Sequence, residues 1–351
     1  APVGSTKRPC PTMRSRNVLV VSAITASLLA GLWLRPKQPQ AAAEAIVSKQ
    51  AASKQAVSKP GVTEPGVKSP VLLPAQASQP KTKDGRQYPL VPAEPAELAT
   101  LLAAVEQALR DPATAAEALP DLGHQQQVIY RVLSTDQPRS QQVVDALPPG
   151  WRSVAERHLA ARREFVRMSR GRGPTMLPAW RIIQPEPAAN LLNYYRKAEA
   201  ATGIEWEVLA AVNLVETGMG RIDGISVANA QGPMQFLPTT WAEPGIGAGN
   251  IRDPHDAIQA AARYLVRRGG LQDIRRGLWG YNNSDYYGRA VLLYASLMKE
   301  DPAAYTGLYH WEIHFNAAAG DLWLPVGYNQ PQRITVEQHL QANPASRSPN
   351  G

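Results

Sequence analysis

Apolar residues recur at every third or fourth position along most of the chain that follows Pro95. This spacing places the apolar side chains on one face of a helix. The first such stripe consists of Leu98, Leu101, Leu102, Val105 and Leu109, and it ends at Asp111-Pro112. Further helices are predicted over residues 124–134, 151–169, 186–202, 206–217, 254–268 and 284–300. Because the alternating runs typical of strands are scarce, we predict an all-α fold.

Glycine and proline residues gather between positions 171 and 187 and interrupt the helical pattern. We therefore predict a helical accessory region over residues 91–184 and a second helical domain over residues 185–330. The last segment, residues 331–351, is expected to form a C-terminal tail.

The N-terminal quarter has a different pattern, since residues 18–34 form 17 consecutive positions without a charge. This length is at the lower limit for crossing a bilayer. Four basic residues precede the segment and two follow it. The positive-inside rule therefore predicts a cytoplasmic N-terminus over residues 1–17 and a transmembrane signal anchor over residues 18–34. The alternative is a cleaved export signal, because Ala41-Ala42-Ala43 resembles a small-residue cleavage site, and cleavage after Ala43 would give a secreted protein.

Residues 35–90, which follow this segment, are rich in proline, alanine, lysine, serine and glutamine. A segment of this composition buries too little apolar surface to offset the chain entropy that folding removes. We therefore predict a disordered linker between the anchor and the helical part of the chain.

The formal net charge of the chain is +8, but the excess of positive charge is confined to the N-terminal quarter. Residues 1–90 hold 13 Lys and Arg against 3 Asp and Glu, whereas residues 91–351 hold 24 against 26. Because a nucleic-acid-binding fold concentrates basic residues on its own surface, we expect no nucleic-acid partner. The single cysteine, Cys10, excludes an internal disulfide framework and a multi-thiolate zinc site.

The segment from Trp206 to Glu216 is apolar at eight of its eleven positions. A helix that is apolar nearly all round is expected at the centre of a domain. Glu216 follows Val212 by four residues and Leu209 by seven, which places its carboxyl group on a buried face. Burial favours the protonated form, and a glutamic acid that stays protonated near neutral pH is suited to general-acid catalysis. The alternative is a glutamate that emerges into solvent where the apolar run ends.

Three further short motifs follow Glu216 along the chain. They are Gly232-Pro233-Met234-Gln235-Phe236-Leu237-Pro238, Asp253-Pro254-His255-Asp256-Ala257-Ile258 and Gly280-Tyr281-Asn282. Together with Val215-Glu216-Thr217, and in this order, they resemble the catalytic domain of SLT-type lytic murein transglycosylases. These enzymes belong to the lysozyme-like superfamily, which includes goose-type lysozyme. The resemblance covers about residues 200–300 and is closest to the membrane-bound B type.

The resemblance implies a lysozyme-like catalytic domain and a role for each matching residue. Glu216 corresponds to the catalytic acid. The residues implied to contact the glycan are Thr217, Met234, Gln235, Tyr281 and Asn282. For Met234 the alternative is ordinary core packing, and for Tyr281 and Asn282 it is a turn at the entry to a helix.

The implied reaction is cleavage of the β-1,4 bond between N-acetylmuramic acid and N-acetylglucosamine in peptidoglycan, as part of cell-wall remodelling. In this family the acetamido oxygen of the substrate stabilises C1. The deprotonated acid then takes the proton of the sugar's own O6 hydroxyl, which yields a 1,6-anhydro product. One carboxyl group is sufficient for this route, whereas most glycosidases use two.

Two other functions stay open at the level of the sequence. The first is a lysozyme-like hydrolase, or muramidase, in which Asp223 positions a water molecule opposite Glu216. The second is a non-catalytic scaffold that binds the cell wall.

No cofactor is implied by the resemblance, and we predict no metal. Residues 243–250, which stand where some B-type enzymes carry a calcium loop, lack the alternating Asp and Asn ligands that calcium requires. His310 and His314 have helical spacing but do not form the His-Glu-x-x-His arrangement of metalloproteases. The expected partners are peptidoglycan glycan strands and, through the anchor, the membrane. We therefore expect the catalytic domain in the cell envelope, on the extracytoplasmic side.

Overall fold

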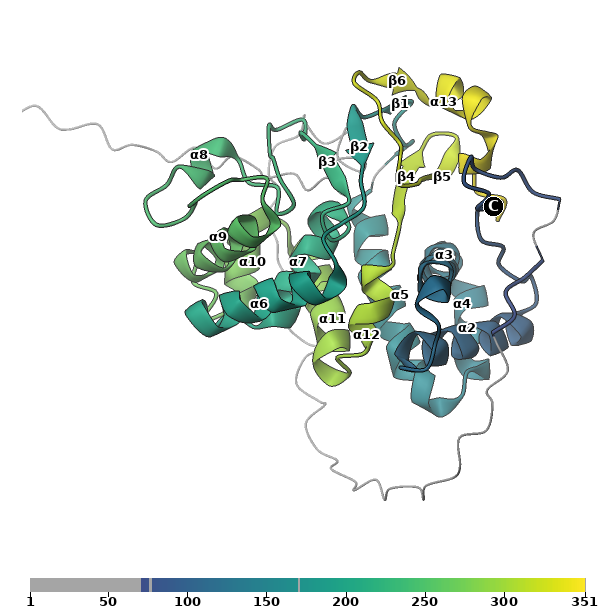
Figure 1. The fold of residues 1–351 in the computed structure, drawn as a ribbon. Helices are drawn as coiled ribbons and strands as arrows, with labels where there is room; N and C mark the ends of the chain where they lie inside the picture. The colour runs from purple at the N-terminus through teal and green to yellow at the C-terminus, as the bar shows by residue number, and fades with distance from the viewer. Residues whose placement is uncertain (1–70, 76–77, 170, 351) are drawn as a thin grey trace, which may run out of the picture.

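The computed structural model of the chain describes residues 71–75, 78–169 and 171–350. Helices dominate these residues and lie in two groups, with short strands gathered along one edge of the molecule (Figure 1). The helix-rich architecture predicted from the apolar periodicity is therefore confirmed.

The first group of helices comes from the N-terminal half of the described chain. It consists of α2 (Pro95–Arg110), α3 (Leu119–Thr135), α4 (Gln137–Ala146) and α5 (Pro149–Met168). Each of the four has proline in its first turn, where a missing N–H costs nothing and the fixed backbone angle favours the helix. The predicted apolar stripe of α2 is buried along its whole length. The sequence analysis missed α4 because its buried face consists of only Ser140, Val143 and Val144.

The second group surrounds α7 (Trp206–Thr217), whose predicted and observed limits agree. Its other members are α6 (Ala188–Thr202), α8 (Pro238–Trp241), α9 (Pro254–Arg267), α10 (Ile274–Asn282), α11 (Asp285–Glu300) and α12 (Ala304–Tyr309). Every residue of α7 except Glu207 is buried. The nearly continuous apolar surface of α7 is covered because α6, α9 and α11 all pack against it.

In the described part of the chain, six short strands form three antiparallel pairs, which the sequence analysis did not predict. They are β1 (Met176–Leu177) with β6 (Ile334–Thr335), β2 (Trp180–Ile182) with β3 (Ile222–Gly224), and β4 (Ile313–Ala317) with β5 (Gly320–Leu324). The expectation of an all-α fold is therefore corrected to a helix-rich fold with small sheets. Strands of two to five residues are too short for their alternation to stand out in a sequence. The predicted C-terminal tail supplies β6 and a further helix, α13 (Val336–Ala342).

One apolar core connects the two groups of helices. Helix α11 packs against both α5 and α7, and α12 packs against α2 and α3. The buried cluster runs without interruption from Leu98 in α2 to Trp311 beyond α12. A separate, smaller cluster lies under the strands and includes Trp180, Phe315 and Leu324. The glycine- and proline-rich segment 171–187 thus leads the chain from one group to the other while the interior stays continuous.

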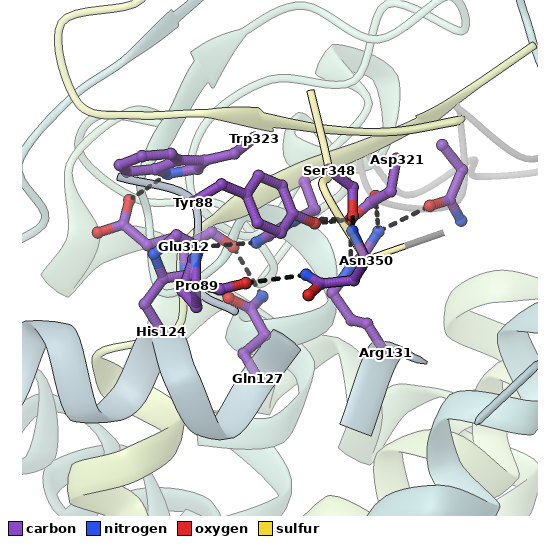
Figure 2. A network of polar contacts seen from close by, with 12 residues as sticks. Tyr88, Pro89, His124, Gln127, Arg131, Glu312, Asp321, Trp323, Ser348 and Asn350 are labelled. Carbon is purple, nitrogen blue, oxygen red and sulfur yellow. Dashed lines mark hydrogen bonds and ion pairs between the residues drawn. The ribbon is translucent and has the colours of Figure 1, made fainter. Parts of the chain in front are cut away.

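The segment before α2 lies against the molecule rather than apart from it. Tyr88 is 3 % exposed, and its hydroxyl group donates a hydrogen bond to Asp321 of β5 (Figure 2). Arg86 forms an ion pair with Glu312 at 3.0 Å. The predicted linker limit at residue 90 is therefore too late. The sequence analysis missed these contacts because both partners lie more than 220 positions further along the chain, and local composition does not depend on them.

The predicted cytoplasmic segment 1–17, the predicted anchor 18–34 and most of the predicted linker 35–90 lie outside the described residues. Within the described ranges, none of the helices combines the length and the apolar character that crossing a membrane requires.

Candidate active site

Glu216 lies in the last turn of α7 and has no exposed surface. The helix ends directly after it because Gly218 adopts a left-handed conformation with φ of +61°. A side chain at Gly218 would also meet Ile313 of β4, since a Cβ atom there would lie 2.5 Å from the Ile313 Cδ1 atom. The end of α7, next to Glu216, therefore lies close against the neighbouring strand.

The carboxyl group of Glu216 has one protein partner. The Tyr287 hydroxyl donates a hydrogen bond to its Oε1 atom at 2.8 Å, while its Oε2 atom has no partner among the described residues. Burial raises the pKa of Glu216 to about 8, and the bond from Tyr287 opposes this shift. Neither cause is a neighbouring charge. Glu216 is therefore protonated at neutral pH, as the sequence analysis predicts for its buried position.

The loop that follows α7 returns to its end. Gln231 and Phe236 pair across a tight turn, and Gly232 within it has a φ of +74°. A Cβ atom at Gly232 would lie 1.9 Å from the carbonyl oxygen of Ile251, so only glycine fits this close approach. The Thr217 hydroxyl donates to the Pro233 carbonyl oxygen at 2.6 Å and thereby ties the loop to α7.

This turn presents Met234 and Gln235. Gln235 has a φ of +49°, an unfavourable conformation for a residue with a side chain. Its Nε2 atom donates to the Gly232 carbonyl oxygen at 3.0 Å, but its Oε1 atom has no partner among the described residues although it is buried. The Met234 side chain is fully buried in the main core, and its carbonyl oxygen accepts a bond from the Tyr281 hydroxyl at 2.8 Å.

Tyr281 and Asn282 end α10 and complete the site. The ring of Tyr281 packs against Phe236 and Tyr264, with ring centres 6.0 and 5.6 Å away. Asn282 is 1 % exposed, and neither its oxygen nor its nitrogen has a hydrogen-bond partner in the described part of the chain. The negative charge that Glu216 would carry raises the pKa of both Tyr281 and Tyr287, after the larger effect of their burial, which places both tyrosines close to the carboxyl group.

The fold thus brings together the residues that the sequence analysis singled out. Glu216, Gln235 and Asn282 each carry a buried polar atom for which the described ranges offer no hydrogen-bond partner. Buried polar atoms are rarely left without a bond, so these atoms are suited to the hydroxyl and acetamido groups of a bound sugar. Thr217 differs, because its hydroxyl also lies 3.2 Å from Asn213 and accepts from the Gly220 N–H at 3.0 Å. The glycan contacts of all five implied residues stay predictions.

Tyr287 is the site residue that the sequence analysis missed. It lies in the first turn of α11, after the N-cap Ser284. One signal was present, since Tyr287 begins the buried stripe of α11 that continues at Val291, Tyr294 and Met298. A hydroxyl group on a core-facing stripe needs a buried partner, and the nearby Tyr281-Asn282 motif indicated where that partner would be.

Asp223, the residue that a hydrolase would require, lies on β3 opposite Arg181 of β2. Its carboxylate forms ion pairs with Arg181 and with Arg252, the latter at 2.9 Å. Both oxygen atoms of Asp223 are therefore engaged by guanidinium groups.

The structure brings together a group of possible metal ligands that the sequence analysis did not consider. Asp253, His255 and Asp256 hold possible ligand atoms within 4.8 Å of one another. Asp253 caps α9 by accepting from the Asp256 N–H, and Asp256 accepts from the Asn250 N–H at 2.9 Å. These bonds explain the arrangement as a helix cap. His314 lies on β4 and contacts Asp321, whereas His310 follows α12, so their sequence spacing does not reflect one helix face.

Comparison with protein families agrees with this geometry. The Transglycosylase SLT domain model matches residues 193–286, which span Glu216, the turn of Gln235 and the Tyr281-Asn282 pair. Searches of curated proteins and of solved structures give no match. The chain therefore contains a lysozyme-like SLT domain at residues 193–286, the domain of lytic transglycosylases that act on peptidoglycan.

Proposed function

We propose that the protein cleaves the β-1,4 bond between N-acetylmuramic acid and N-acetylglucosamine and leaves 1,6-anhydro-muramic ends. The observation that carries this proposal is the isolation of the Glu216 carboxyl group, whose pKa is shifted by burial and by Tyr287 and by no charged neighbour. Glycosidases with two carboxyl groups keep them about 5–10 Å apart. A second carboxylate at that distance in a buried site would be expected to shift the pKa of Glu216.

In the proposed reaction Glu216 acts first as an acid and then as a base. Its Oε2 atom, which lacks a protein partner, donates the proton to the glycosidic oxygen as the bond to C1 breaks, and N-acetylglucosamine leaves with a free 4-hydroxyl group. The acetamido oxygen of the muramic residue stabilises C1. The O6 hydroxyl then attacks C1 and returns its proton to Glu216, so the protonated enzyme is restored without water.

The tyrosine partner suits both halves of this cycle. While Glu216 is protonated, the Tyr287 hydroxyl holds Oε1 and leaves Oε2 to donate. Once Glu216 has lost its proton, the same bond stabilises the carboxylate, since it lowers the pKa of Glu216. Because Oε2 has no exposed surface, the side chains that cover it must move apart when the glycan binds.

Product masses distinguish this reaction from hydrolysis. We expect intact sacculi digested with the full chain to release muropeptides with anhydro ends, about 18 Da lighter than hydrolysed products. The Asp223→Asn variant is expected to give the same products at about the same rate, because Asp223 is engaged by two arginines. Mass spectrometry of digests from both proteins measures this. Reducing-end products, or loss of activity in Asp223→Asn, would support the hydrolase instead.

We further propose that residues 18–34 anchor the enzyme in a membrane and that the following linker lets the SLT domain reach the wall, as in the B type. The support is the uncharged run and its basic flanks. We expect the full chain to stay with membranes after an alkaline wash, and a chain lacking residues 1–37 to become extractable. An unchanged distribution after this deletion would contradict the anchor.

A further inference from the structure

A cavity lies behind α7, on the side away from Glu216. On the helix, Leu214 and Val215 point into this cavity, and Glu216 projects to the opposite side. Helices α3, α5 and α11 and strands β2, β3 and β4 supply the other walls. The cavity therefore lies at the junction between the two groups of helices. Its volume is about 40 Å³, room for roughly three water molecules.

The polar groups of this cavity carry an excess of positive charge. Its charged and polar lining residues are Gln127, Arg131, Arg162, Glu312 and His314. Both acidic groups nearby are already engaged. Glu312 pairs with Arg86. Asp321 pairs with Arg131 in the network drawn in Figure 2. The guanidinium groups of Arg86, Arg131 and Arg162 thus face Glu312 and Asp321, while the more exposed Asp121 is a second partner of Arg86.

Arg162 is the cation left without a counterion. It is 8 % exposed, and within the described residues it forms no ion pair and its Nε atom has no hydrogen-bond partner. Burial, and to a smaller degree the nearby charge of Arg131, lowers the pKa of Arg162 to about 10, so the side chain is still charged at neutral pH. Leaving a charge buried and unpaired is strongly destabilising, and a guanidinium group does not escape this by losing its proton.

We propose that this cavity binds a small carboxylate, of the size of formate or acetate, on the guanidinium group of Arg162. A carboxylate matches the planar, forked array of donors of an arginine better than a spherical anion does. The remaining wall includes the apolar side chains of Phe165, Trp180 and Leu214, against which a short aliphatic group can pack. Binding supplies the missing negative charge and stabilises the contact between α5, α7 and β4.

The test compares acetate with chloride at equal ionic strength. A ligand that binds only the folded protein raises the free energy of unfolding by RT ln(1 + [L]/Kd), and the melting temperature rises with it. At an acetate concentration tenfold above its dissociation constant, we expect the Tm of the full chain to rise by about 3 °C relative to chloride. The Arg162→Met variant is expected to lose this difference. Arg163→Met, which removes a partly exposed arginine next to it on α5, should retain it.

General salt effects are removed by comparing the proteins with one another. Acetate and chloride also differ in how strongly they are excluded from protein surfaces, and this effect acts equally on wild type and variants. A titration of ¹³C-acetate followed by NMR provides the direct measurement, with Arg162→Gln as a second variant. The proposal is overturned if the wild type melts at the same temperature in acetate and in chloride. It is also overturned if both Arg162 variants show the same acetate shift as the wild type.

Discussion

Replacing Glu216 by glutamine is expected to lower kcat/KM for peptidoglycan by about 10²–10⁴-fold, the usual contribution of a general acid. Glutamine keeps the shape of the side chain and still accepts the bond from Tyr287, but it has no proton to give to the glycosidic oxygen. Release of muropeptides from purified sacculi measures the loss. Glu207→Gln makes the same chemical change in the first turn of α7 and is expected to leave the rate within about twofold.

The same substitution is expected to stabilise the fold in a pH-dependent way. The pKa of Glu216 is about 8 in the folded protein and 4.5 as its ordinary value. A raised pKa contributes stability that is fully present below pH 4.5 and is lost as the pH rises towards 8. At pH 7 this loss amounts to about 3 kcal/mol in the free energy of unfolding, and Glu216→Gln avoids it.

Chemical denaturation at several pH values tests this linkage. The difference in unfolding free energy between Glu216→Gln and wild type should be small near pH 4.5 and should grow as the pH rises to 8. Burial also raises the pKa of Glu207, which is only partly buried, so Glu207→Gln should show a smaller change of the same sign over this range. A Glu216→Gln variant that keeps full activity would contradict the catalytic role assigned to Glu216. Added stability that is independent of pH would contradict its burial.

Replacing Gly232 by alanine is expected to lower kcat/KM by about 100-fold, the effect of displacing a site by roughly 1 Å. The new Cβ atom would lie 1.9 Å from the Ile251 carbonyl oxygen, and since that atom belongs to the backbone, the turn itself must shift. The shift displaces Gln235 and the Met234 carbonyl oxygen, which accepts from Tyr281. Muropeptide release and thermal unfolding measure the two consequences.

Gly245→Ala is the matched control for backbone strain. Gly245 has a φ of +77°, close to the +74° of Gly232, but a Cβ atom there would lie 3.5 Å from its nearest neighbour, the Arg267 side chain. Both variants therefore carry the cost of a left-handed residue, about 1 kcal/mol, and only Gly232→Ala carries the collision. Equal activity in the two variants would show that the turn of Gly232 does not position the site.

Local pattern was sufficient where an element buries one continuous apolar face. The predicted limits of α7 agree with the observed ones, and α9 was predicted at 254–268 and is observed at Pro254–Arg267. Helix α10 was missed because Gly277 and Gly280 interrupt its pattern. Both glycines serve close packing, since a Cβ atom at Gly277 would lie 2.8 Å from the Gly270 Cα atom, and one at Gly280 would lie 2.5 Å from the Arg268 side chain. Glycine is required at these two positions by a tertiary contact. In a local sequence pattern such a glycine looks the same as one that ends a helix.

The sequence by itself determined that the described part of the chain is rich in helices and that the excess of positive over negative charge lies outside it. It also determined that Glu216 lies at the end of a central apolar helix. These properties follow from periodicity and composition, which act over a few neighbouring residues. The tertiary structure decided that Tyr287 holds Glu216, that Asp223 is engaged by Arg181 and Arg252, and that Arg162 is buried without a counterion. Each of these depends on residues that are distant in the chain, and only folding brings them within reach of one another.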